Sequence, residues 1–337
     1  MKRIGQYTLE LENKPRVMAS AAIGGKKESE GPLAADFDQT FSDTMLAEKS
    51  WEKAEAILQK EALGLAMAKA GIQAQAVEMV FAGDLLNQCI SSTFGLRDFN
   101  IPFLGQYGAC STMAQTLLMA SIMVEAGAAK IAAAVTSSHF CSAERQFRLP
   151  LEYGGQRTPT AQWTATASGC AIIGGSGAVQ IEHVMPGKIV DLGIKDAANM
   201  GAAMAPAAAM SYADYFKDTG TSPEDYDAMF TGDLGMVGSG LLGKLLQEEG
   251  ITIGSKHKDC GLMLYDLEKQ DVHAGASGCG CSGSVFCGHI MRELSSPNGR
   301  YRNILFAATG ALMSPTSTQQ GESIPGIAHI VHLRRVS

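Results

Sequence analysis

The hydrophobic pattern of residues 103–139 predicts a strand, a sharp turn, a buried helix and a second strand. Apolar residues recur with helical spacing on two faces of residues 113–124, so we expect other elements to surround this helix. Gly127 follows the last turn, where a left-handed cap is favoured. The continuous apolar run 131–135 is typical of a strand covered on both faces. The segment is therefore predicted to lie at the centre of the fold.

The second half of the chain repeats this design. Residues 271–312 again contain a glycine-rich turn, here with Cys281 and Ser282, followed by a helical pattern and an apolar strand. Upstream, the sequence VEMVFAGDL at 77–85 is echoed by YDAMFTGDL at 226–234. Internal repetition of this kind determines the architecture. We expect two copies of one α/β unit, related by a pseudo-twofold axis.

The repeat divides the chain into residues 1–185 and 186–337, with an insertion at 140–160. An amphipathic helix is expected before the first echoed strand, and a second one over 205–217 before the other. The insertion is rich in arginine. It fits a flap over the Cys110 region, a contact with a second subunit, or a solvated basic loop.

Composition and charge exclude several classes of protein. The net charge of −7 makes nucleic acid an improbable partner, and no nucleic-acid binding is expected. The start of the chain does not have the pattern of a secretory signal peptide. The longest apolar region, 117–135, contains Glu125 and Lys130, so it predicts a helix and a strand and not a membrane span. Eight cysteines without a signal peptide indicate reduced thiols.

Cys110 lies in the turn that begins the central helix. Unpaired N–H groups and the positive end of the helix dipole favour a thiolate there. A small buried cysteine without a chemical role fits the same position. Position alone leaves both interpretations open.

Three other side chains end predicted strands of the core. His139 could act as a base or a ligand donor, or could be a core histidine with its hydrogen bonds made. Asp84 and Asp233 end matching strands in the two halves, where they could serve the site or cap loops by accepting backbone N–H bonds.

A metal site in the second half is not supported by the sequence. The spacing C-x-C-x5-C-x-H matches no common zinc pattern, and a turn packed with small residues explains it better. The residues concerned are Cys279, Cys281, Cys287 and His289.

The doubled unit with a cysteine at the start of the first buried helix resembles the thiolase fold, which includes the thiolases and the ketoacyl-acyl-carrier-protein synthase III enzymes. Ala109, Cys110 and Ser111 are similar to their nucleophile turn. The resemblance implies an α/β fold of two thiolase-like halves in an α-β-α-β-α layered architecture. It also implies a homodimer.

Within this superfamily the whole chain resembles a family of stage V sporulation proteins from spore-forming bacteria. The stretches that carry the resemblance include GPLAADFD (31–38), AGDLLNQ (82–88), YGACST (107–112), TSSHF (136–140), AERQFR (143–148), EYGGQ (152–156), KHKDCG (256–261), SGCGCS (277–282) and ATGALMSP (308–315).

The chain departs from the condensing enzymes at two places. Those enzymes use a cysteine with histidine and asparagine, or with two histidines, to stabilise an oxyanion. Where the synthase III family carries histidine, this chain has Asp233, and where it carries asparagine, this chain has Ser277. His257 and His273 do not stand at the matching positions. The departures argue for a retained binding site with a vestigial nucleophile and against catalysis.

The sporulation family implies a function in binding dipicolinic acid (pyridine-2,6-dicarboxylate), in its uptake into the forespore and in its release at germination. The expected ligand-binding residues are Cys110, Ser111, Asn87, His139, Arg145, Arg148, Asp233 and Ser277. An acyltransferase that uses Cys110 with non-standard partners is the alternative.

The same resemblance implies partners and a location. It predicts the other stage V sporulation A membrane proteins as partners and a peripheral position on the inner membrane of the forespore or spore. No metal or cofactor is expected, apart from calcium that could accompany dipicolinate.

Overall fold

The strands of the two halves run in the same order. In a computed structural model, which describes residues 1–147 and 157–336, one sheet path is β6-β5-β7-β9-β3 and continues as β10-β15-β14-β11-β12. The first set comprises β3 (Arg16–Gly24), β5 (Met79–Gly83), β6 (Phe103–Gly105), β7 (Ala132–Ser138) and β9 (Ala167–Gly174). The second comprises β10 (Val179–Met185), β11 (Ala228–Thr231), β12 (His257–Asp259), β14 (Asn303–Ala311) and β15 (Gly326–Arg335).

Strand directions repeat as well. In the first set β5 is parallel to β6 and β7, whereas β9 is antiparallel to β7 and β3. In the second set β11 is parallel to β12 and β14, whereas β15 is antiparallel to β14 and β10. The predicted doubling of one α/β unit is therefore confirmed, because order and direction agree strand by strand.

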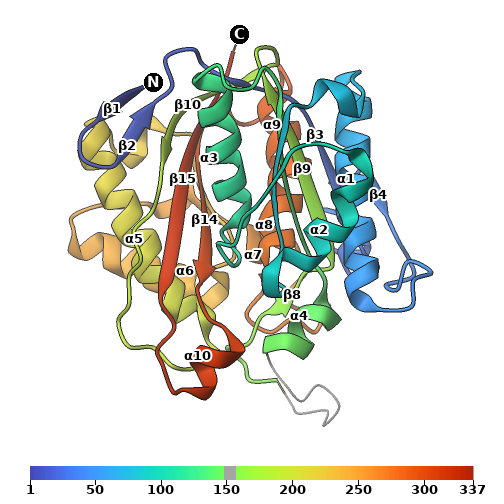
Figure 1. The fold of residues 1–337 in the computed structure, drawn as a ribbon. Helices are drawn as coiled ribbons and strands as arrows, with labels where there is room; N and C mark the ends of the chain where they lie inside the picture. Colours follow the sequence, from blue (N-terminus) through green and yellow to red (C-terminus); the bar gives the residue numbers. More distant parts are fainter. Residues whose placement is uncertain (148–156, 337) are drawn as a thin grey trace.

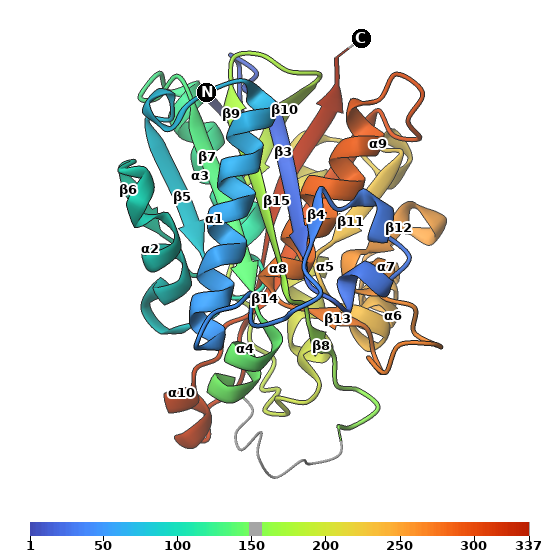
Figure 2. The ribbon, with the colours of Figure 1, turned by 90° about the vertical axis from the view of Figure 1, so that its right-hand side faces the viewer.

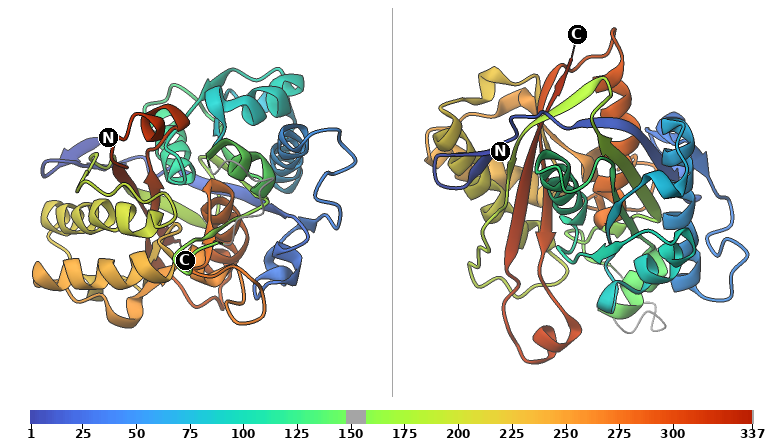
Figure 3. Two further views of the ribbon diagram at one scale, coloured as in Figure 1. Left: turned by 90° about the horizontal axis from the view of Figure 1, so that it is seen from below. Right: turned by 45° about the horizontal axis from the view of Figure 1, so that its top comes forward.

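Helices form three layers around the two sets of strands (Figure 1). Helix α3 (Thr112–Glu125) packs against β5 and β7 on one side and β14 and β15 on the other. Its pseudo-symmetric mate α8 (Cys279–Val285) lies beside it and continues through a π-helical turn (Phe286–Ile290) into α9 (Met291–Ser295). The views in Figures 2 and 3 place the remaining long helices outside the strands.

The outer layers have matching helix pairs. Helix α1 (Trp51–Ala70) covers β3 and β9 and packs on α2 (Ile90–Leu96). Helix α5 (Met200–Thr219) covers β15 and packs on α6 (Gly235–Glu248). The helix predicted over residues 205–217 corresponds to α5. The prediction was too short at its N-terminal end, since α5 begins at Met200. The five-layered thiolase-like fold class is confirmed.

Local sequence signals explain the bounds of α1. The Ser50 hydroxyl accepts a hydrogen bond from the Lys53 N–H at 3.4 Å, as an N-cap does. Gly71 follows the helix with φ +68°, a left-handed conformation that glycine adopts without strain. Ala54, Leu58 and other apolar residues of this helix are buried against the sheet, as their spacing predicts.

The two sets of strands meet through a short join. Strand β10 pairs with β3 at Val179–Val17 and Gln180–Arg16, but with β15 along its length. The topology thus groups β10 with the second set. Whether residues 1–185 and 186–337 behave as two halves stays a prediction.

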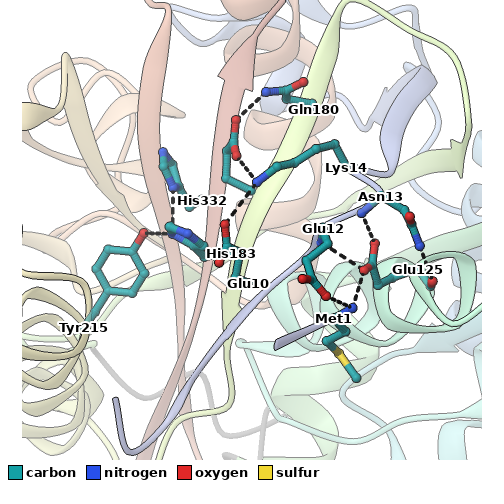
Figure 4. A network of polar contacts seen from close by, with 11 residues as sticks. Met1, Glu10, Glu12, Asn13, Lys14, Glu125, Gln180, His183, Tyr215 and His332 are labelled. Carbon is teal, nitrogen blue, oxygen red and sulfur yellow. Dashed lines mark hydrogen bonds and ion pairs between the residues drawn. The ribbon is translucent and has the colours of Figure 1, made fainter. Parts of the chain in front are cut away.

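A polar network covers this join (Figure 4). The Lys14 ammonium donates to Glu182 at 2.5 Å, and the Nδ1 atoms of His183 and His332 lie 3.2 Å apart. His183 also contacts the Tyr215 hydroxyl at 2.9 Å. Burial lowers the pKa of both imidazoles, so the pair is uncharged at neutral pH.

The remaining elements are short. They are β1 (Lys2–Ile4), β2 (Thr8–Glu10), β4 (Gln39–Thr40), α4 (Phe140–Phe147), β8 (Trp163–Thr164), α7 (Cys260–Met263), β13 (Ala276–Ser277) and α10 (Pro315–Gln319). Among the described residues, no helix is both long enough and apolar enough to cross a bilayer.

Candidate functional site

Cys110 sits in a tight turn at the start of α3. The preceding Ala109 has φ +49°, an uncommon conformation for a residue with a side chain. A Cβ atom added to Gly310 of β14 would lie 2.3 Å from the Gly108 carbonyl oxygen, so only glycine lets the strand approach this turn. The second half of the fold thus holds the Cys110 backbone in place.

Ser111 does not present donors to a ligand. Its N–H and its hydroxyl both donate to the Gly108 carbonyl, at 3.0 and 2.6 Å, and its side chain is buried. Both groups serve to close the turn. A role of Ser111 in ligand binding stays a prediction.

Ser277 and Asp233 from the second half face the Cys110 thiol. The Ser277 Oγ lies 3.9 Å from the Cys110 Sγ and donates to the Asp233 Oδ2 at 3.3 Å. The same carboxylate oxygen accepts from the Gly278 N–H at 2.8 Å, and the other accepts from the Thr309 hydroxyl at 3.1 Å. The Cys110 thiol, the Ser277 hydroxyl and the Asp233 carboxyl group thus form one continuous line of polar contacts. All three residues were predicted for the same site from the sequence.

The electrostatics of this chain favour the neutral thiol. Burial raises the pKa of Cys110 well above its usual value, and the nearby Asp233 raises it further. Burial also raises the pKa of Asp233 to about 7. Of the two interpretations that the position of Cys110 left open, these surroundings favour the neutral buried thiol, because desolvation and a neighbouring acid oppose the helix dipole.

A narrow pocket of about 30 Å³ opens onto Cys110. Its described lining combines apolar side chains with a few polar groups: Leu85, Tyr107, Cys110, Ala143, Glu144, Phe147, Thr164, Met200, Ser277 and Met313. The space is about that of one water molecule. The described lining contains no lysine or arginine.

Helix α4 supplies one wall of this pocket. Ala143 and Phe147, four residues apart, share the helix face that packs with Cys110 and Leu85. In Figure 2, α4 lies near β8 at one end of the molecule. The described part of the insertion therefore borders the Cys110 region, and its role as a flap stays a prediction.

Several residues that line the pocket were not predicted from the sequence. They are Tyr107, Glu144, Phe147, Met200 and Met313. The i, i+4 spacing of Ala143 and Phe147 was the available signal for α4. Met200 and Met313 come from loops and helix ends of the second half, and their sequence surroundings gave no signal.

Arg145 points away from the Cys110 pocket. Its guanidinium pairs with Glu52 of α1 and lies 5.1 Å from the centre of the Trp51 ring. Arg145 therefore does not line the Cys110 pocket in this structure, and its role as a ligand-binding residue stays a prediction. Arg148, the other predicted arginine, lies outside the described residues.

Asn87 and His139 also make contacts elsewhere. Asn87 exchanges hydrogen bonds with Gln146, at 3.0 and 3.3 Å. The buried His139 donates from Nε2 to the Thr44 carbonyl at 2.8 Å and accepts from the Cys141 N–H at Nδ1. Burial lowers the pKa of His139, in keeping with this neutral tautomer. Neither residue lines the Cys110 pocket, and the role of both in ligand binding stays a prediction.

Asn87 and Arg145 instead line a second, wider groove between α1, α2 and α4. Its volume is about 800 Å³. Lys53, Lys60 and Arg97 add positive charge, and Glu48, Glu52 and Asp98 add negative charge. The predicted site residues thus divide between two pockets.

The matching aspartates have different tasks. Asp84 accepts from the Leu86 N–H and from the Ser92 N–H and hydroxyl, so it caps the loop after β5. Asp233 faces Cys110. Asp233 also accepts the Gly278 N–H, so it combines the capping role with a position beside the Cys110 thiol.

The second-half cysteines belong to the core. Cys279 donates to the Ser137 carbonyl at 2.9 Å and packs near Cys110, whereas Cys281 points towards the Gly232 carbonyl. No cluster of three or more metal-binding side chains occurs among residues 1–147 and 157–336.

Comparison with known proteins assigns the family. The sequence profile of stage V sporulation protein AD matches residues 5–334. The chain belongs to the stage V sporulation protein AD family. It is 44% identical to the Bacillus subtilis (strain 168) stage V sporulation protein AD over 336 residues, which cover 99% of this chain and 98% of that protein.

Solved structures support the fold. The 3-oxoacyl-[acyl-carrier-protein] synthase III of Aquifex aeolicus aligns with a TM-score of 0.56 and 11% identity, covering 95% of this chain and 99% of its own. An OleA structure from Xanthomonas campestris aligns with a TM-score of 0.59 and 12% identity. The alignment covers 97% of this chain and 100% of the OleA chain. At such low identity the likeness establishes the thiolase-like fold and not the activity.

Proposed function

We propose that this sporulation protein binds dipicolinic acid in the Cys110 pocket without catalysing acyl transfer, and that it takes part in dipicolinate uptake into the forespore and release at germination. Membership of the stage V sporulation protein AD family supports the biological setting. The contact of Cys110 with Ser277 and Asp233 is the observation that carries the non-catalytic assignment.

This contact disfavours thioester chemistry for two reasons. A thiol whose pKa is raised by burial and by Asp233 is a weak nucleophile at neutral pH. An oxyanion formed on an acyl group at Cys110 would also lie near the Asp233 carboxyl group, which repels negative charge whenever it is ionised. The alternative of an acyltransferase is favoured only by the position of Cys110 at the start of α3.

The pocket suits a flat aromatic ring once it widens. Leu85, Phe147, Met200 and Met313 provide apolar walls, and the Cys110 and Ser277 groups provide neutral donors. A pyridine ring needs more room than the 30 Å³ present, so side chains of the wall must move. The flexible methionines are suited to such repacking.

Two ionised carboxylates require cationic or N–H donors. Arg148 follows Phe147 directly in the sequence and remains the proposed cation for this ligand. Calcium accompanying dipicolinate would supply positive charge instead. Arg145, paired with Glu52, serves as the matched control.

Calorimetric titration of pyridine-2,6-dicarboxylate tests the proposal. We expect binding by the wild-type protein, weaker binding by Cys110→Ala, and a loss of roughly 1–3 kcal/mol in Arg148→Ala. Arg145→Ala is expected to bind as the wild type does. No binding by the wild type would contradict the ligand assignment, and unchanged affinity in both Cys110→Ala and Arg148→Ala would place the site elsewhere.

Catalysis is tested separately with acetyl-CoA and malonyl-CoA. We expect no turnover and no acyl group on Cys110 by mass spectrometry. Turnover that disappears in Cys110→Ala would overturn the non-catalytic assignment.

We also propose a homodimer that forms along β6. This strand ends the sheet path, and Phe103 and Leu104 expose apolar side chains on it, as do Ile90 and Phe94 of the adjoining α2. An open, apolar edge strand is a template for pairing with a second copy.

As further parts of this proposal, the protein sits peripherally on the inner membrane and its partners are other stage V sporulation A membrane proteins.

A further inference from the structure

Asp233 is a buried carboxyl group held by neutral donors. Its side chain is fully buried and accepts hydrogen bonds from the Gly278 N–H and from the hydroxyls of Ser277 and Thr309. These contacts come from β14 and from the turn before α8. Each donor is uncharged, so none balances a negative charge on the carboxylate.

The titratable groups around Asp233 are also acids. They are Cys110 of the α3 turn, Cys279 and Cys281 of α8, Asp259 of β12 and Cys260 of α7. The nearby His257 contacts Thr231 at 2.8 Å, and burial lowers its pKa to about 4, so it is neutral. Glu144 adds a further carboxyl group to the pocket wall. An anion that enters this pocket therefore meets, among the described residues, groups that are neutral or negative.

We propose that the Cys110 pocket binds its anionic carboxylate ligand together with one proton, and that Asp233 is the group that holds this proton. The inference rests on the proposed function, since it concerns the same pocket and the same ligand. Two unprotonated carboxylates that face each other across Ser277 in a buried site repel strongly, and a shared proton removes this repulsion.

The hydrogen bonds of Ser277 show how the proton changes the site. When Asp233 is ionised, the Ser277 hydroxyl donates to Asp233 Oδ2 and turns its hydrogen away from Cys110. When Asp233 is protonated on Oδ2, it donates to Ser277 instead, and the Ser277 hydrogen is released to face the pocket. The proton comes from the solvent, and no covalent bond to the ligand forms.

The free energy of this protonation is small near neutral pH. Burial raises the pKa of Asp233 to about 7, which is close to neutral pH. Above this value, each pH unit lowers the fraction of protonated protein about tenfold. The ligand's own carboxylates remain ionised over the same range, because ordinary carboxyl pKa values lie near about 4.

Calorimetry in buffers of different ionisation enthalpy counts the protons that binding takes up. With pyridine-2,6-dicarboxylate, we expect the wild-type protein to take up about one proton at about pH 8.5 and almost none at about pH 5.5. Affinity should fall about tenfold per pH unit above about pH 7. In Asp233→Asn, uptake should be lost and affinity should become nearly independent of pH.

Glu144→Gln separates Asp233 from the other carboxyl group of the wall. We expect this variant to keep the proton uptake of the wild type. Uptake that is absent in the wild type at about pH 8.5, or that disappears in Glu144→Gln and persists in Asp233→Asn, would overturn the inference. Because the wild-type measurement decides the first of these outcomes, the test does not depend on the folding of a variant. Absence of any binding would contradict the proposed function itself.

Discussion

The Cys110 sulfur lies 3.9 Å from the Ser277 hydroxyl oxygen, although 167 residues separate them in the sequence. One residue precedes the central helix of the first half, and the other precedes the matching helix of the second half. The contact passes directly to Asp233. The second half of the fold therefore supplies polar groups that face the Cys110 thiol.

Cys110 should react slowly with iodoacetamide at neutral pH. It is buried, and its raised pKa leaves little thiolate. We expect Cys141, which is only partly buried, to be alkylated first. Removing the neighbouring acid in Asp233→Asn should speed the alkylation of Cys110, since Asp233 contributes to the raised pKa. Peptide mass spectrometry over time measures both rates, and a wild-type Cys110 that reacts before Cys141 would contradict this electrostatic account.

Gly310→Ala should destabilise the turn that carries Cys110. A Cβ at this position would lie 2.3 Å from the Gly108 carbonyl oxygen, so backbone must move. We expect a loss of roughly 1–3 kcal/mol in the free energy of unfolding, measured by denaturant titration.

Gly240→Ala is the matched control for this substitution. Gly240 lies in α6, and a Cβ there meets no atom of the described residues within 4 Å. Alanine should stabilise the helix at this position by about 0.5–1 kcal/mol. Equal effects of the two substitutions would show that the Gly310 contact is unimportant.

Glu55→Gln should reduce the loss of stability at high pH. Glu55 is buried and accepts hydrogen bonds from Ser137 and Ser142, and burial with the nearby Asp84 raises its pKa from 4.5 to about 8. The folded protein thus keeps a proton that the unfolded chain releases, so stability falls as pH rises towards about 8.

A comparison of thermal unfolding at about pH 6 and about pH 9 measures this effect, for which we expect roughly 1–3 kcal/mol in the wild type. Glutamine can still accept from Ser137 and donate to Ser142, whose hydroxyl also donates to the His139 carbonyl. The variant should therefore lose less stability over this range. An identical pH dependence in both proteins would show that Glu55 does not hold the proton.

Leu104→Lys should separate the proposed dimer. Leu104 lies on the edge strand β6 with 46% of its surface exposed, so a charge there leaves the monomer intact but disfavours an apolar interface. Sedimentation should show a dimer for the wild type and a monomer for the variant. A wild-type monomer at micromolar concentration would remove the dimer proposal. Met236→Lys, a substitution at an exposed residue of α6, is the control and should remain dimeric.

The sequence by itself determined the doubled architecture and the position of the turn at Cys110. The repeat of the GDL stretches and the apolar spacing of residues 113–124 were sufficient, because hydrophobic periodicity is local information. It also predicted Ser277 and Asp233 as site residues, through positions that match in related families, and the structure places both beside Cys110.

Only the tertiary structure decided which groups surround the Cys110 thiol and which residue the Arg145 side chain contacts. The helix start favours a thiolate, but burial and the contact with Asp233 reverse this preference, and neither can be read from neighbours in sequence. Arg145 is close in sequence to pocket residues, yet its helix face points towards Glu52. The charge of a buried group depends on which distant atoms surround it, and packing alone brings those atoms together.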